Sequence, residues 1–236
     1  MVDLLPESAR IVYITPSHQY PLGVVMSMPR RLALLGWARR HGAAVIEDDY
    51  DSEFRHVPRP LEPVQRLDDG GRVIYLGSFS KTLSPSLRLG FAVLPAPLAG
   101  PVAALRQLID WHPPLATQLA LASFLGDGSF DRHLRRSGRV YTQRHQILQA
   151  ALSGPLAAAL TGIRSRAGLH VTALLPPGRA EGQARAAAAA RGIATTGLSQ
   201  YFHARPAQAG LVIGFGSITA ADLPAALTAL GEALTS

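Results

Sequence analysis

RVIYLGSFSKTLSPSLRLGF, residues Arg72 to Phe91, reads as a β-strand followed by a polar turn. The β-branched and aromatic run at 73–76 predicts the strand, which stops at Gly77. Lys81 lies in the turn and is the only lysine among the 23 lysine and arginine residues. Arginine cannot replace lysine where a neutral, nucleophilic nitrogen is needed, because its guanidinium stays protonated. A Schiff base with an aldehyde needs such a nitrogen. The alternative is that a bias toward arginine left one lysine at an arbitrary place.

The composition bounds the class of protein. The chain has 236 residues, enough for one large domain or one and a half ordinary ones. It is 47% hydrophobic and has no apolar run of membrane-spanning length, so we expect a soluble globular chain with no membrane partner. It contains no cysteine, which excludes disulfides and thiolate metal sites. The start, MVDLLPESAR, lacks the pattern of a secretory signal, and we expect a cytoplasmic protein with no metal site.

The net charge of +7 leaves two interpretations open. A basic surface is typical of nucleic-acid binding. The arginines are scattered along the chain, however, and a compositional bias with basic residues on solvated helix faces is the favoured explanation.

The order of elements predicts an α/β fold. Strands alternating with a helix indicate parallel βαβ units, and we expect strands at 9–15 (buried), 43–46, 73–76 and 87–94, with a helix at 29–41. Further on, we expect helices at 97–111, 116–125 and 129–153, then strands at 168–175, near 193 and at 211–215, with helices at 180–190 and from 220. Pro155 marks a change, so we place a domain boundary near residue 154, which gives domains 1–154 and 155–236.

Polar clusters follow three of these strands, at the end of a parallel sheet where ligands bind. A cofactor such as pyridoxal phosphate needs a carboxylate beside its ring nitrogen, and Asp48 or Asp49 could supply it. Tyr50 could donate to the ring oxygen beside the imine. Ser78, Ser80 and the fork of Arg88 could hold the phosphate. Each residue alone has an ordinary structural explanation, but their conjunction at strand ends favours a cofactor site.

The residues at this point resemble a family. SFSKTLSPSLRLGF is similar to the lysine segment of fold type I aminotransferases. Together with TPSHQYPLG and VIEDDYDSEFR, it resembles the aminotransferase-like domain of MocR-type regulators of the GntR family. The resemblance continues through FLGDGSFDRHLRRSGRVYTQRH and GLVIGFGSI, and so covers nearly the whole chain. It implies part of the large domain of a fold type I aminotransferase, a mostly parallel sheet with flanking helices, plus a small C-terminal α/β domain.

The resemblance also implies roles for single residues. Lys81 would bind the aldehyde of pyridoxal 5′-phosphate, Asp48 would contact the pyridine nitrogen, and Tyr50 would contact the phenolic oxygen. Ser78 and Arg88 would hold the phosphate. Tyr20 falls where ordinary aminotransferases place an asparagine beside the ring oxygen, and the similar regulators have an aromatic residue there.

Three departures from the family pattern matter. The regulators begin with a winged-helix DNA-binding domain, which this sequence lacks. It also lacks the glycine-rich phosphate loop, so we expect an N-terminally truncated chain that binds the cofactor poorly and tends to associate. Relatives commonly have an arginine for the substrate carboxylate where this sequence has Gln200, and Arg205 is a possible substitute.

Two functions remain open. The first is a pyridoxal-phosphate-binding, effector-sensing domain of a transcriptional regulator, which would bind an amino acid or amine, form a homodimer in its full-length form, and contact DNA only through a domain absent from this chain. The alternative is a fragment of an active class I/II aminotransferase, in which Lys81 would carry protons. The regulatory role is favoured over turnover. A third possibility is a remnant without function.

Overall fold

The computed structural model describes residues 2–56, 61–204 and 206–235. Its contacts divide the chain into two compact units, which we describe separately. The first unit comprises Met1–Gln19, Val24–Glu53 and Arg59–Arg135, and the second Tyr20–Gly23, Phe54–Pro58 and Arg136–Ser236. The two units divide between residues 135 and 136, inside a long helix. The domain boundary predicted near residue 154 stays a prediction. Within the described residues, no helix is long and apolar enough to cross a membrane.

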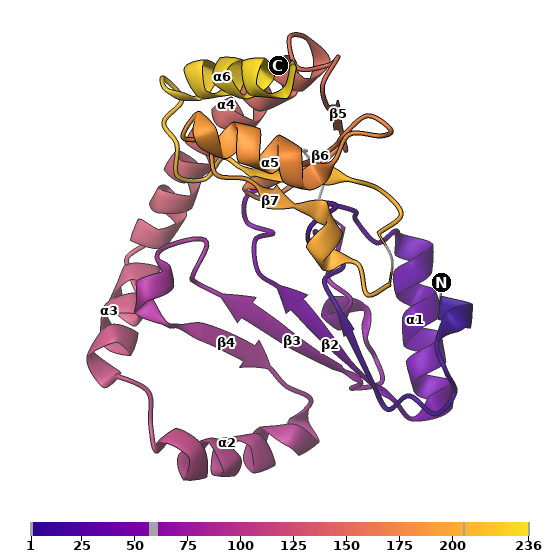
Figure 1. Cartoon of the computed structure of the whole chain (residues 1–236). Coiled ribbons are helices and arrows are strands. Elements are labelled where there is room, and N and C mark those ends of the chain that lie inside the picture. Colours follow the sequence, from indigo (N-terminus) through magenta and orange to yellow (C-terminus); the bar gives the residue numbers. More distant parts are fainter. Residues whose placement is uncertain (1, 57–60, 205, 236) are drawn as a thin grey trace. The chain divides into compact units, whose positions relative to one another are not determined.

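The first unit is built on a four-stranded sheet. Its strand order is β1 (Ile11–Ile14), β2 (Ala44–Asp49), β3 (Val73–Ser78) and β4 (Gly90–Val93). β1, β2 and β3 are parallel, whereas β4 pairs with β3 in the antiparallel direction (Figure 1). The sheet is therefore mostly parallel, as the sequence predicts, and β2 and β3 end beside each other, with Asp49 opposite Gly77.

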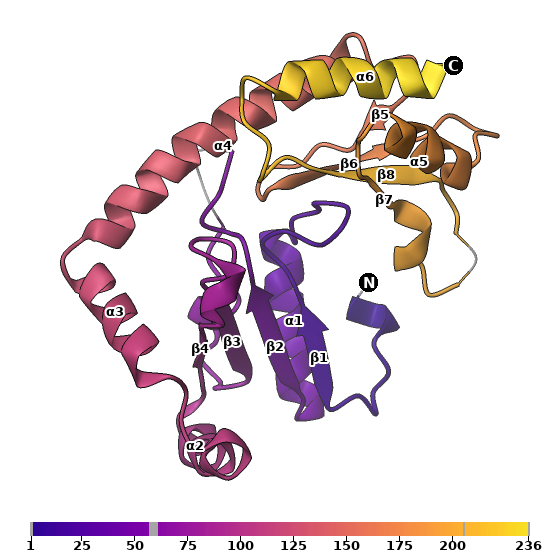
Figure 2. The ribbon, with the colours of Figure 1, turned by 60° about the vertical axis from the view of Figure 1, so that its left-hand side comes forward.

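Helix α1 (Met28–His41) packs beside β1 and β2 and closes the core of this unit (Figure 2). A proline in its first turn suits the helix start. Gly42 ends it in the left-handed conformation, with φ of 62°, and its N–H bonds back to the carbonyls of Ala38 and Arg39. Leu34, Leu35, Trp37 and Ala38 of the helix are buried in one core with Val45 and Val73 of the sheet, whereas Leu32 is 51% exposed.

The two faces of the sheet differ. In β2, exposure alternates along the strand, and Val45, Glu47 and Asp49 are buried while Asp48 is half-buried on the opposite face. Val12 and Ile14 of β1 pack on the α1 core, but Ile11 and Tyr13 are 63% and 59% exposed. The prediction that this first strand is buried was therefore wrong for its outer face.

Three helices follow β4, with bounds within two residues of those predicted. They are α2 (Ala96–Asp110), α3 (Leu115–Gly126) and α4 (Ser129–Ser153). Short 3-10 helices occur at η1 (Val2–Leu4), η2 (Gln65–Leu67), η3 (Pro85–Leu87) and η4 (Leu198–Tyr201). None of the described side chains of α2 and α3 is buried, and Leu108, Ile109 and Trp111 are more than 70% exposed.

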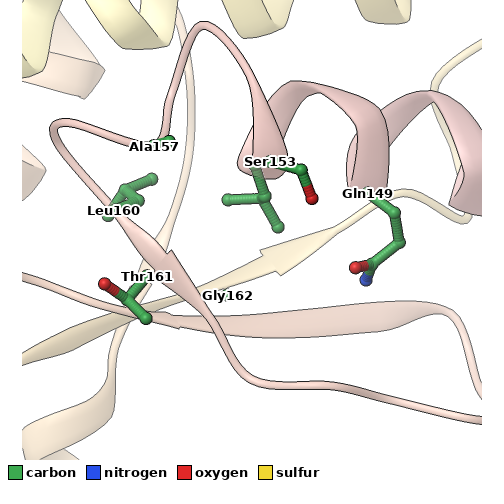
Figure 3. A pocket seen from close by; sticks show the side chains of 7 residues that line it. Gln149, Ser153, Ala157, Leu160, Thr161 and Gly162 are labelled. Atoms are coloured by element: carbon green, nitrogen blue, oxygen red, sulfur yellow. The ribbon is translucent and has the colours of Figure 1, made fainter.

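The second unit contains an antiparallel sheet of order β5 (Thr161–Gly162), β6 (His170–Leu174), β8 (Gly210–Gly214) and β7 (Thr196–Gly197). Helices α5 (Glu181–Ala190) and α6 (Leu223–Thr235) and the end of α4 supply its core. The predicted strands and helices are present here, except that the short strand expected near residue 193 lies at Thr196–Gly197 (β7), and the two-residue strand β5 was not predicted. Near the end of α4 lies a depression of about 250 Å³ with no charged group in its wall (Figure 3), lined by Gln149, Leu152, Ser153, Ala157, Leu160, Thr161 and Gly162.

A short segment of the second unit, Phe54–His56, pairs with residues 166–168 through an isolated antiparallel bridge between Arg55 and Ala167. The N–H of His56 bonds to the carbonyl of Arg166, and the N–H of Gly168 bonds to the carbonyl of Phe54. The ring of His56 stacks on the ring of His145 in α4, with centroids 4.0 Å apart and planes 10° apart.

The surroundings of this histidine pair disfavour a positive charge on it. Burial, and then the charge of His56, lowers the pKa of His145 to about 4, although the carbonyl of Ser165 acts in the opposite direction. The amide of Gln149 lies 3.4 Å from Nε2 of His145. Besides His56, the ionisable residues on the two paired segments are Arg55 and Arg166, which are cations.

The buried side chain of Arg31 connects three separate segments of the first unit. Arg31, 1% exposed, donates to the carbonyls of Pro16 (2.8 Å), Met26 (2.9 Å) and Glu62 (3.0 Å). Its Nη1 lies 3.8 Å from the carboxylate of Glu47, which is also buried. Burial raises the pKa of Glu47, and the N–H groups of Gln65 and Val64 and the charge of Arg31 oppose that rise.

We expect Arg31→Met to lower the free energy of unfolding by about 3–5 kcal/mol, because it leaves a buried carboxylate without its counter-charge. Arg30→Met is the matched control, since Arg30 is the exposed neighbour and should change stability by about 0.5 kcal/mol or less. Urea unfolding measures both variants. Equal losses would show that Arg31 has no special role.

The second prediction concerns pH. The folded-state pKa of His145 is lowered, so the unfolded state binds this proton first, and stability should fall as pH falls from about 6.5 to about 4. His145→Gln should remove about 1–2 kcal/mol of that fall, less than the full shift would give because the ring is only partly buried. The measurement is urea unfolding at several pH values, with exposed His203→Gln as control. An unchanged slope in His145→Gln would contradict the prediction.

Candidate functional site

The turn after β3 presents Lys81. Its ends are held by backbone bonds from the N–H of Phe79 to the carbonyl of Leu89 and from the N–H of Leu83 to the carbonyl of Phe79. Nε2 of His133, in the first part of α4, lies 2.7 Å from the carbonyl of Thr82 and so anchors the residue after the lysine. Lys81 itself is exposed, and its amine has no hydrogen bond or ion pair within the described residues.

Arg88 and Ser78 flank this turn. Arg88 has φ of 51°, in the left-handed region that non-glycine residues rarely adopt. Such backbone strain is concentrated at functional sites. Its guanidinium contacts no acid or carbonyl in the part of the chain that the structure describes. Oγ of Ser78 accepts from the N–H of Ser80 at 3.2 Å. An arginine that has no acid or carbonyl partner among the described residues can bind an anion.

Strand β3, which precedes the turn, approaches β4 very closely, because Gly77 and Gly90 have no side chain at the point of contact. A Cβ on Gly90 would lie 2.8 Å from the carbonyl oxygen of Gly77, and a Cβ on Gly77 would lie 2.3 Å from the ring of Phe91. The two glycines therefore set the exit of the chain from β3 toward Ser78 and Lys81.

Asp48 and Asp49 lie on opposite faces of the sheet. Asp49 is 4% exposed, and its Oδ2 accepts from the hydroxyls of Ser52 (2.6 Å) and Tyr75 (2.8 Å). Asp48 is half-buried on the open face, where one carboxylate oxygen accepts from the hydroxyl of Tyr13. A ligand can therefore reach Asp48, whereas Asp49 belongs to the interior.

Residues after β2 form a buried network with the loop after β1. The hydroxyl of Tyr50 donates to the carbonyl of His18 at 2.7 Å, and Nδ1 of His18 lies 2.8 Å from Asp51. Burial raises the pKa of Asp51, and the charges of His18 and Lys81 oppose that rise. The charge of Lys81 therefore favours the ionised form of Asp51 in this network. Because β1, β2 and β3 are parallel, the polar residues that follow them lie at the same end of the sheet.

The remaining predicted residues belong to the second unit. The hydroxyl of Tyr20 lies 3.0 Å from that of Tyr201, and its ring packs against His170 with centroids 4.7 Å apart. Burial, and then the contact with Tyr201, raises the pKa of Tyr20 to about 12. Gln200 lies in η4 and is partly exposed. Arg205 lies outside the described residues.

Sequence reasoning missed three contributors to the site. Tyr13 donates to Asp48 from the neighbouring strand, His133 contacts the carbonyl of Thr82, and Asp51 contacts Nδ1 of His18. The register of the strands and the packing of α4 bring these residues in, and neither follows from local patterns.

The residues present fit a phosphorylated aldehyde cofactor such as pyridoxal phosphate. The chain offers an amine at Lys81, an accessible carboxylate at Asp48 and, at Arg88, a guanidinium with no partner among the described residues, all within the first unit. Tyr50 donates its single hydroxyl proton to the carbonyl of His18, so donation to a cofactor oxygen would require the hydroxyl to turn away from that carbonyl.

The sequence of the chain matches the profile of the family described as aminotransferase class I and II, over residues 3–230. It is 41% identical to the probable rhizopine catabolism regulatory protein MocR of Rhizobium meliloti over 211 residues, which are 89% of this chain and 43% of that protein. It is 38% identical to the pyridoxine biosynthesis transcriptional regulator PdxR of Corynebacterium glutamicum, over 90% of this chain and 46% of that protein. The chain thus spans about half the length of these relatives.

Solved structures agree with the sequence relatives. A kynurenine aminotransferase of Pyrococcus horikoshii matches with a TM-score of 0.87 and 25% identity, over 96% of this chain and 56% of its own. The α-aminoadipate aminotransferase LysN of Thermus thermophilus, solved with N-(5′-phosphopyridoxyl)-L-leucine, matches with a TM-score of 0.86 and 28% identity, over 95% and 58%. The predicted fold class is confirmed, as is the resemblance to MocR-type regulators. The chain belongs to the aminotransferase class I and II family, and its fold is part of a fold type I aminotransferase.

Proposed function

We propose that this chain is the pyridoxal-phosphate-binding, effector-sensing part of a transcriptional regulator of the MocR type. The observation that carries the proposal is the combination of Lys81, Asp48 and Arg88 at the ends of β2 and β3, each with an atom open to a ligand. The names of the similar regulators MocR and PdxR support the regulatory role.

Each residue would have a distinct task. When bound, pyridoxal phosphate supplies an aldehyde that condenses with amines and a ring that withdraws electrons. Nζ of Lys81 would hold the aldehyde carbon, and Asp48 would keep a proton on the ring nitrogen. Arg88 and Ser78 would hold the phosphate, and Tyr50 would donate to the ring oxygen. Tyr20 remains a proposed contact of that oxygen.

The effector would be an amino acid or an amine that competes with Lys81 for the aldehyde. Gln200 and Arg205 are its proposed contacts. A neutral amide at Gln200 cannot form the bidentate, charge-assisted bond that an arginine forms with a carboxylate, so a carboxylate is recognised less strongly at that position. The effector would act by stabilising one of two states of a homodimer.

An active aminotransferase is the second candidate, because the aminotransferases of P. horikoshii and T. thermophilus match over nearly the whole chain. Turnover separates the two candidates. A regulator binds amines without steady release of keto acid, whereas an aminotransferase releases keto acid over many cycles.

The test of the proposed function is covalent trapping. The 236-residue chain is mixed with pyridoxal phosphate, reduced with borohydride and mapped by mass spectrometry. We expect the pyridoxyl group on the peptide that contains Lys81, the only lysine, and its loss from that peptide in Lys81→Arg. The amine at the N-terminus serves as the internal control, and labelling there alone would contradict the assignment.

A further inference from the structure

Asp48 and Asp49 each accept a hydrogen bond from a tyrosine on a neighbouring strand, but on opposite faces of the sheet. Asp49 faces the interior and accepts from Tyr75 of β3, whereas Asp48 faces outward and accepts from Tyr13 of β1. Tyr75 is half-buried, and burial, followed by the charge of Asp49, raises its pKa. Tyr13 is 59% exposed, so its position cannot be explained by burial of its ring in a core.

The register of the strands determines this contact. Tyr13 lies opposite Ile46, and its long side chain extends along the strand to reach Asp48, two residues further on. Side chains at alternate positions share one face, so Tyr13 and Asp48 both lie on the face opposite α1. Burial, followed by the hydrogen bond to Asp48, raises the pKa of Tyr13 to about 12. Tyr13 is therefore protonated at neutral pH and donates to the carboxylate.

We propose that Tyr13 is a positioning residue that fixes the carboxylate of Asp48, with one oxygen bound to the tyrosine and the other free for the ring nitrogen of the cofactor. This inference rests on the proposed function. Within residues 2–56, 61–204 and 206–235, the second oxygen of Asp48 has no hydrogen-bond partner. A carboxylate held at one oxygen cannot rotate freely, so its other oxygen is already oriented when the ring arrives.

The test is a double-mutant cycle on the full chain with Tyr13→Phe, Asp48→Asn and the double variant, in cofactor titrations followed by absorbance. Tyr13→Phe removes one hydrogen bond and should weaken binding about fivefold. In the Asp48→Asn background the same change should have no further effect, because the group that it positions is absent. Tyr75→Phe is the matched control and should leave cofactor affinity unchanged.

A second readout needs no cofactor. The carbon NMR signal of the Asp48 carboxylate should move in Tyr13→Phe and stay in place in Tyr75→Phe, with the unfolding midpoint of Tyr13→Phe unchanged. The proposal is overturned if Tyr13→Phe binds the cofactor as tightly as the wild type, or loses the same factor in both backgrounds. If Asp48→Asn alone leaves cofactor binding unchanged, the proposed function itself fails, and the positioning role falls with it.

Discussion

The buried guanidinium of Arg31 is the constraint on which the first unit depends. Three backbone carbonyls accept from it: those of Pro16, after β1, Met26, before α1, and Glu62, in the connection after β2. Loops that carry binding groups are exposed and would otherwise be mobile. A single cation on α1 ties the two loops that leave β1 and β2 to the same helix, and Glu47 balances its charge. The polar network at the sheet edge is held in place by these bonds.

The side chains of β2 alternate between the two faces of the sheet, so structural acids lie on one face and the acid available to a ligand lies on the other. On one face, Glu47 and Asp49 are buried, and both oxygens of Glu47 and Oδ2 of Asp49 accept hydrogen bonds from the protein itself. On the other face, Asp48 keeps an oxygen for a ligand. Because successive strand residues point to opposite faces, two adjacent aspartates can serve two functions without competing. The cluster EDDYD thus holds three buried acids, Glu47, Asp49 and Asp51, and one outward-facing acid, Asp48.

The sequence predicted the regular parts of this structure well. The bounds of α4 agree with the expectation because its basic, amphipathic pattern is long, and β3 is identified by its β-branched run. The direction of β4 and the two-residue β5 were not predicted, because neither leaves a periodic pattern. Lys81, Asp48, Ser78 and Arg88 could be named from residue chemistry and family resemblance. The contacts of Tyr13 and His133 could not, since they depend on strand register and on the packing of a distant helix.

The central claim is that the open face of β2, through Asp48, receives the ring of pyridoxal phosphate. Nitrogen NMR of cofactor labelled at the ring nitrogen tests it most directly, with the wild-type chain, Asp48→Asn and Asp49→Asn. This account predicts a protonated ring nitrogen in the wild type and in Asp49→Asn, and loss of that proton in Asp48→Asn, because an amide does not stabilise the charge. Loss of the proton in Asp49→Asn with retention in Asp48→Asn would contradict the account and place the cofactor on the other face.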